Sequence, residues 1–133
     1  MHAARLTAQL LGGAPARSPE AVCERLLAVQ GQDPRGFRLA VRARTKGLTV
    51  ADVDRALADR TLVVTWLNRG TLHLVRSEDY GWLHALTAPQ HETAIRRRLA
   101  QEGIADPERG VAVIERSLAA AGARTREQLR VRV

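Results

Sequence analysis

Two glutamines separated by one residue, Gln30 and Gln32, are the side chains of this sequence whose spacing could serve a reaction. On an extended or turning backbone, positions i and i+2 project to the same side, so the two amides could hold one water molecule together. In a continuous helix the same side chains would point about 200° apart, and the pair would not form. Gly31 and Asp33-Pro34 favour a helix end near Gln30, which would allow the pair.

The chemistry open to two amides is mild. An amide is not a general base at neutral pH, but its carbonyl dipole can orient a water molecule and stabilise a developing oxocarbenium sugar. That assistance suffices for a good leaving group, and an N-alkylated purine already carries a positive charge that weakens its glycosidic bond. The pair therefore fits hydrolysis of such a bond. In the alternative interpretation, Gln30 and Gln32 only satisfy backbone groups at a helix end.

The densest run of positive charge begins directly after this pair. Between positions 35 and 46 the sequence has no acid and five cations: Arg35, Arg38, Arg42, Arg44 and Lys46. On a helix, Arg35, Arg38 and Arg42 would share one face at the spacing i, i+3, i+7, which predicts contact with DNA phosphates. Such contacts position a duplex without reading its sequence. The alternative is a solvated helix face.

Two residues downstream complete the predicted DNA-binding set. Arg69 lies at an expected hairpin tip, where a wing commonly reaches a phosphate or the minor groove. His73 shares a strand face with Thr71 and Val75 and is either a DNA-binding residue or a structural histidine. Asp33, which precedes a proline, is expected to cap a helix rather than to act as a base.

Composition narrows the partner and excludes several classes. The chain has 133 residues and a formal net charge of +7, which favours a polyanionic partner. Aromatic residues make up 3%, too few for a platform that stacks single-stranded bases, so we expect double-stranded DNA. One cysteine excludes an internal disulfide, and no ligand spacing suggests a metal or another cofactor. With no span-length apolar segment, we expect a cytoplasmic protein without membrane contact. The sequence does not fix the oligomeric state, for which a monomer is the default.

The elements that must position these residues follow from caps, prolines and glycines. A short helix should precede Gly12, a second begins at Ser18-Pro19, and Cys23 lies on its apolar stripe. The remaining predicted helices lie over about 34–44, 49–59 and 107–122 and from 125 onward, and the predicted strands lie over 62–68 and 71–76. A further helix is expected to begin at Ser77 and to be interrupted or restarted at Pro89, with the basic segment 96–98 on the next helix.

This order of three helices followed by a hairpin is typical of a winged helix. We therefore predict a mainly α fold with a small β-hairpin wing, an α+β winged-helix module of the helix-turn-helix type. Residues 1–76 form the first winged-helix region, with the wing at about 62–76. Residues 77–133 are expected to be a helical connection and the start of a second winged-helix region, cut off inside a helix.

Three segments in this order resemble the AlkZ-like DNA glycosylase family. They are residues 28–35 (A-V-Q-G-Q-D-P-R), 48–57 (L-T-V-A-D-V-D-R-A-L) and 69–75 (R-G-T-L-H-L-V). The resemblance implies tandem winged helices around a basic channel, and the N-terminal portion of an enzyme that removes alkylated purines or unhooks interstrand crosslinks. The family's Gln-x-Gln pair would fall on Gln30 and Gln32.

One position departs from the family's pattern, because Gly31 stands where a hydrophobic residue is usual. The resemblance also leaves an alternative open. Many members are known only as winged-helix DNA-binding proteins, so the resemblance implies DNA binding more firmly than catalysis. The alternative is a noncatalytic DNA-binding protein, such as a regulator or a resistance protein.

Overall fold

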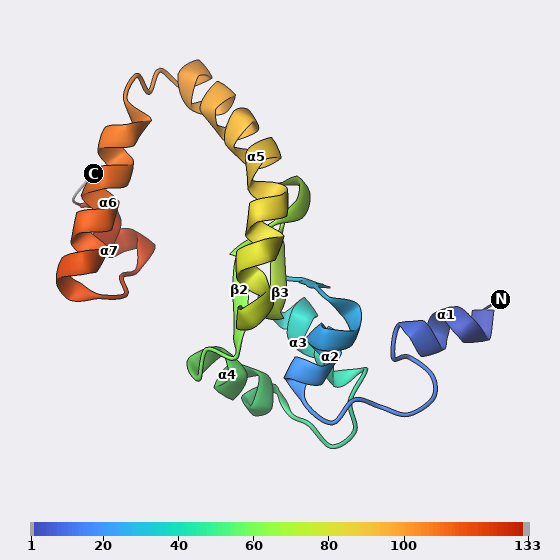
Figure 1. Cartoon of the computed structure of the whole chain (residues 1–133). Coiled ribbons are helices and arrows are strands. Elements are labelled where there is room, and N and C mark those ends of the chain that lie inside the picture. The colour runs from blue at the N-terminus through green and yellow to red at the C-terminus, as the bar shows by residue number, and fades with distance from the viewer. Residues whose placement is uncertain (1, 132–133) are drawn as a thin grey trace. The chain divides into compact units, whose positions relative to one another are not determined.

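The computed structural model describes residues 2–131, which fall into two compact units divided between His91 and Glu92. The first unit contains a run of short helices and all three strands (Figure 1). Its helices are α1 (His2–Ala8), α2 (Pro19–Leu26), α3 (Pro34–Arg42) and α4 (Val50–Ala58), followed by the beginning of α5 (Ser77–Gln101). Its strands are β1 (Val29–Gln30), β2 (Leu62–Trp66) and β3 (Leu72–Arg76), and the short helix η1 (Asn68–Gly70) joins the last two.

Side-chain caps fix where these helices begin. Ser18 accepts a hydrogen bond from the Ala21 N–H before α2, with Pro19 at the first helical position. Asp33 does the same for Arg35 before α3, with Pro34 next. A cap followed by a proline satisfies one of the unpaired N–H groups of the first turn and removes another. The predicted starts of both helices are confirmed.

The end of α2 differs from the prediction. The apolar spacing suggested a helix reaching almost to Gln30, but α2 ends at Leu26, and Leu27 has a left-handed φ of 67°. Val29 and Gln30 instead form β1, which pairs antiparallel with β3. Pairing with a distant strand therefore overrides the local helical pattern, and it adds a third strand to the expected hairpin.

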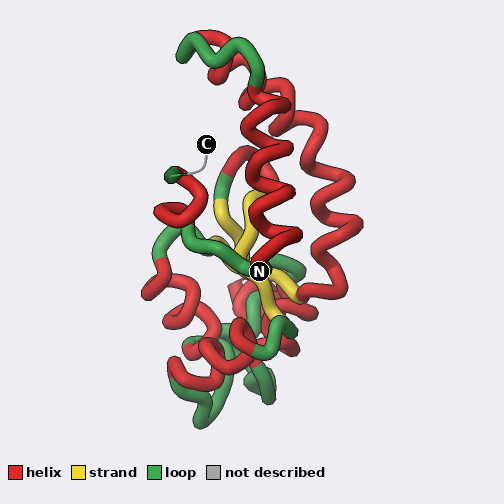
Figure 2. The backbone as a smooth tube through the Cα atoms, turned by 90° about the vertical axis from the view of Figure 1, so that its left-hand side faces the viewer, coloured by secondary structure: helices red, strands yellow, loops and turns green. Residues whose placement is uncertain are grey.

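The sheet has the strand order β1-β3-β2 and is antiparallel throughout. One face carries Val29, Leu62 and Leu74, which pack with residues of α2, α3 and α4 in the main core. The other face carries Val75, which packs with Leu83 of α5 in a smaller core. The strands thus lie between helices on both sides (Figure 2). Cys23 is fully buried in the main core, as its stripe predicts.

The second unit is helical. It holds the end of α5, then α6 (Pro107–Ala121) and α7 (Arg126–Arg130). Asp106 caps α6, which stops at Gly122 with φ 70°, and Thr125 forms a capping box with Gln128 at α7. These boundaries agree with the sequence. Pro89 does not end the helix as expected, because α5 continues through it to Gln101. Among residues 2–131, no helix has the length and apolar character needed to cross a membrane.

Candidate active site and nucleic-acid interface

The two glutamines line one cleft of about 470 Å³ in the first unit. Strand β1 produces this arrangement: Val29 is 7% exposed and points into the core, whereas Gln30 is exposed. The chain stays non-helical through Gly31 and Gln32 until Asp33 starts α3. Gln30 and Gln32 therefore do not lie on opposite sides of a helix. They open toward a common space that a water molecule and a sugar could share.

Gln32 also has a structural contact. Its Oε1 accepts a hydrogen bond from the Leu72 N–H at 3.3 Å, while the Gly31 N–H donates to the Leu72 carbonyl at 2.7 Å. The Gln32 side chain thus takes the place of the Gly31 carbonyl, which would accept from Leu72 in a regular ladder between β1 and β3. Its NH₂ group is not used by this bond.

Gly31 brings β1 unusually close to β3. A Cβ atom at this position would lie 3.3 Å from the His73 nitrogen, the His73 carbonyl carbon and the Leu72 carbonyl carbon. All three are backbone atoms, which cannot move aside as a flexible side chain does. Any larger residue at position 31 would require β3 to shift.

The other polar residues that line the cleft are Gln9, Asp33 and Arg44. The Asp33 Oδ1 accepts a hydrogen bond from the Arg35 N–H at 2.9 Å, so its expected role as a helix cap is confirmed. Arg44 donates to the Gln9 carbonyl at 2.9 Å and to the Ala40 carbonyl at 2.8 Å. Arg44 therefore ties the segment after α1 to the end of α3 and forms part of the cleft wall.

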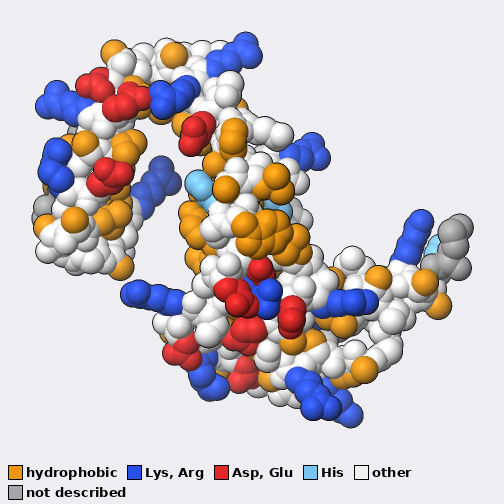
Figure 3. Space-filling model, in the orientation of Figure 1, with side chains coloured by type: hydrophobic (Ala, Val, Ile, Leu, Met, Phe, Trp, Pro, Cys, Tyr) orange, Lys and Arg blue, Asp and Glu red, His pale blue; other side chains and the backbone are white. Residues whose placement is uncertain are grey.

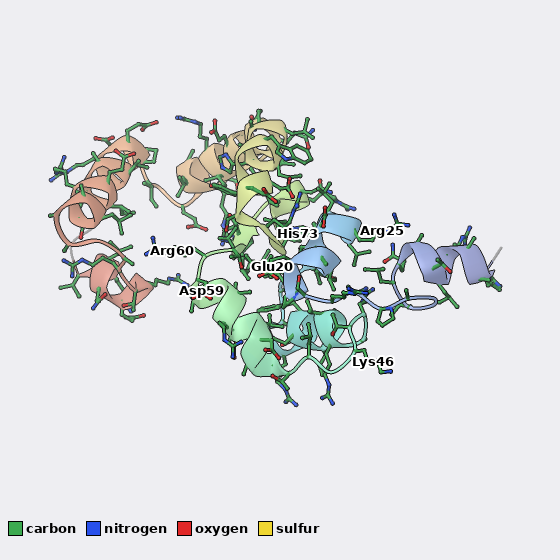
Figure 4. The ribbon with its side chains drawn as sticks, turned by 60° about the horizontal axis from the view of Figure 1, so that its bottom comes forward. Glu20, Arg25, Lys46, Asp59, Arg60 and His73 are labelled. Atoms are coloured by element: carbon green, nitrogen blue, oxygen red, sulfur yellow. The ribbon has the colours of Figure 1, made fainter. Side chains whose placement is uncertain are left out.

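The predicted arginine stripe on α3 is only partly available to a ligand. Arg38 forms an ion pair with Asp54 of α4 at 2.5 Å and donates to the Pro34 carbonyl at 2.6 Å. Arg35, Arg42 and Lys46 are exposed and have no ion pair within residues 2–131. Lys46 lies on the loop after α3, well apart from His73 (Figure 4).

Arg69 lies at the hairpin tip, as expected, and is exposed with φ 57° and ψ 24°. The sequence did not indicate what holds this tip. The His91 Nε2 of α5 contacts both the Gly70 N–H and the Leu67 carbonyl. This histidine, for which the sequence offered no partner, therefore fastens the hairpin to α5. Within residues 2–131, no cluster of side chains could hold a metal ion.

His73 lies directly opposite Gln30 in the pairing of β1 with β3. It is half-buried, and its Nδ1 lies 3.0 Å from the Thr71 carbonyl. The structure thus brings His73 beside Gln30.

Another face of the first unit is unsuited to phosphate. Acidic side chains gather near the start of α5 (Figure 3), where Arg76 pairs with Glu78 at 2.6 Å, Asp79 at 2.7 Å and Glu24 at 3.9 Å. The hydrogen bond from Arg76 lowers the pKa of Asp79, with a further contribution from Trp82, so the carboxylate stays charged. Three carboxylates around one arginine would repel DNA.

Comparison with known proteins shows the family of this chain. The model of the AlkZ-like DNA glycosylase family matches residues 23–133, so the chain belongs to that family, as the three sequence segments suggested. Among solved structures, DNA glycosylase AlkZ of Streptomyces sahachiroi is 35% identical, with a TM-score of 0.55. That match covers 59% of this chain and 21% of AlkZ, so the chain spans about a fifth of this relative. No curated protein matches the chain.

Proposed function

We propose that the first unit is a winged-helix module that binds double-stranded DNA as part of a glycosylase acting on alkylated purines or interstrand crosslinks. The order helix, strand, two helices and hairpin supports this, as does the sheet order β1-β3-β2. The hairpin between β2 and β3 is the wing, with Arg69 at its tip. Family membership and the exposed cations Arg35, Arg42 and Lys46 support DNA as the partner.

The observation that carries the catalytic part is the common cleft of Gln30 and Gln32. One amide orients the attacking water, and the other stabilises the positive charge that develops on the sugar as the base departs. A cationic alkylated purine needs no strong acid to leave, which suits neutral side chains. Residues 77–133 would supply a helical connection and the opening of a second winged-helix region.

A noncatalytic DNA-binding protein, such as a regulator or a resistance protein, is the second candidate. It is favoured by the hydrogen bond from the Leu72 N–H to Gln32, because this bond gives Gln32 a structural role that needs no catalysis. Such a protein would bind DNA and leave modified bases attached.

Base release separates the two candidates. The purified chain in excess is incubated with a duplex containing N7-methylguanine, and released base and bound DNA are both measured. We expect release above the spontaneous rate, about a hundredfold slower in Gln30→Ala, on the scale of losing one transition-state hydrogen-bond group. Gln32→Glu keeps an oxygen for Leu72, whereas Gln32→Ala removes it. Gln101→Ala, in the second unit, is the matched control.

Three outcomes decide between the candidates. Release that depends on Gln30 supports the glycosylase. DNA binding without release by the wild-type chain favours the noncatalytic protein. Absence of DNA binding at low salt contradicts both.

A further inference from the structure

One polar row crosses all three strands of the sheet. Gln30 of β1 pairs with His73 of β3, and His73 pairs with Thr65 of β2. Because the Gly31 N–H donates to the Leu72 carbonyl, the ladder alternates so that Gln30 and His73 form a non-hydrogen-bonded pair. In such pairs the side chains lie close together, with Cβ atoms roughly 4.5–5.5 Å apart. The amide and the imidazole are therefore immediate neighbours.

The row lies on the sheet face that α5 partly covers. Residues two apart on a strand share a face, so His73 is on the same side as Val75, which is fully buried against Leu83. His73 itself is half-buried. Its neighbour on β1, Gln30, is exposed.

A backbone bond fixes which ring nitrogen of His73 carries the proton. Its Nδ1 lies 3.0 Å from the Thr71 carbonyl, and a carbonyl oxygen can only accept, so Nδ1 is the donor. In the neutral imidazole, Nε2 then holds the lone pair. No residue within the described part of the chain makes a hydrogen bond to Nε2. A basic nitrogen is left available next to Gln30.

We propose that His73 is the general base of the reaction, an inference that rests on the proposed glycosylase function. A water molecule held by the Gln30 amide attacks C1′ of the sugar, and its proton passes to His73 Nε2. The glycosidic bond breaks with its electron pair going to the purine, so the cationic base leaves neutral. The products are the free base, an abasic site and a protonated imidazole, which returns its proton to solvent.

Other polar residues of the first unit are less suited to this step. The two glutamines cannot accept a proton at neutral pH. Asp33 is committed through its Oδ1 to capping α3. His91, the other half-buried histidine of the first unit, is held by the hairpin at Leu67 and Gly70.

The test uses a variant that separates structure from catalysis. In His73→Asn, the amide nitrogen stands near the place of Nδ1 and can still donate to Thr71, but nothing replaces Nε2. We expect its thermal midpoint to stay close to that of the wild type and its release of N7-methylguanine at saturating protein to fall about a hundredfold, within the usual range for a general base. Added imidazole should restore part of the rate in His73→Ala.

Two results would contradict the role of His73 as general base without contradicting the proposed glycosylase function. One is wild-type release by His73→Asn, or a loss confined to Asp33→Asn. The other is a ¹⁵N spectrum of the histidine ring in the wild-type chain that places the proton on Nε2. If the wild-type chain releases no base, the proposed function itself fails, and the role of His73 fails with it.

Discussion

At Gly31 the absence of a side chain sets the distance between the two strands that carry Gln30 and His73. Replacing it with alanine places a Cβ 3.3 Å from three backbone atoms of β3, so the strand must give by a few tenths of an ångström. We predict that Gly31→Ala lowers the free energy of unfolding by about 1–3 kcal/mol, the usual cost of overpacking. Urea unfolding measures this. An unchanged midpoint would mean that β3 adjusts freely.

Cys23 shows what burial does to a single thiol. Desolvation, with a contribution from Glu20, raises its pKa from 9.0 to about 12. We predict no reaction with a thiol reagent at pH 8 in the folded chain and complete reaction in urea. Because the unfolded thiol ionises first, stability should fall as pH rises from about 9 toward 12. Fast labelling of the folded chain would contradict the burial.

The sequence could suggest some of these residues but not their contacts. Spacing allowed Gln30 and Gln32 to form a pair, the family resemblance favoured that pair, and the stripe position of Cys23 predicted its burial. Nothing local could reveal that Gln32 bonds to Leu72, forty residues away, or that His73 pairs with Gln30. Those contacts depend on strand register, which distant parts of the chain decide together.

Among the elements, helix starts were the most predictable features, because a cap followed by a proline acts within one turn. The starts of α2, α3 and α6 all follow this pattern. Strand β1 was missed, since two residues are too few to show any alternation. Pro89 was expected to interrupt α5, but the helix continues through it to Gln101. The cost of a proline inside the helix was therefore not enough to end it there.

Helix α3 gives a prediction about DNA binding that its sequence alone would not. Because Asp54 already neutralises Arg38, Arg35→Ala or Arg42→Ala should each reduce the slope of log K against log salt by about 0.9, and Arg38→Ala by clearly less. Asp54→Asn should raise affinity by releasing Arg38. Fluorescence anisotropy with duplex DNA at several salt concentrations measures these slopes. Equal slopes for all three arginine variants would show that the ion pair opens on binding.

For the whole molecule, the net charge, the family and the fold each support DNA as the partner. The net charge of +7 favours a polyanion, and the chain belongs to the AlkZ-like DNA glycosylase family. The net charge does not indicate where on the surface DNA binds, because the face around Arg76 is acidic. The cleft of Gln30 and Gln32 is bordered by Gly36 and Ala40 of α3 and contains one cation, Arg44.

We expect DNA to meet the chain at this cleft, and the side-chain amide signals of glutamine report on such binding directly. The ¹⁵N-labelled chain is titrated with a duplex containing a cationic azasugar, which mimics the charged sugar of the transition state. We predict that the NH₂ signals of Gln30 and Gln32 shift or broaden first, while those of Gln101 and Gln128 in the second unit move less. Binding that leaves the Gln30 and Gln32 signals unmoved would contradict the account.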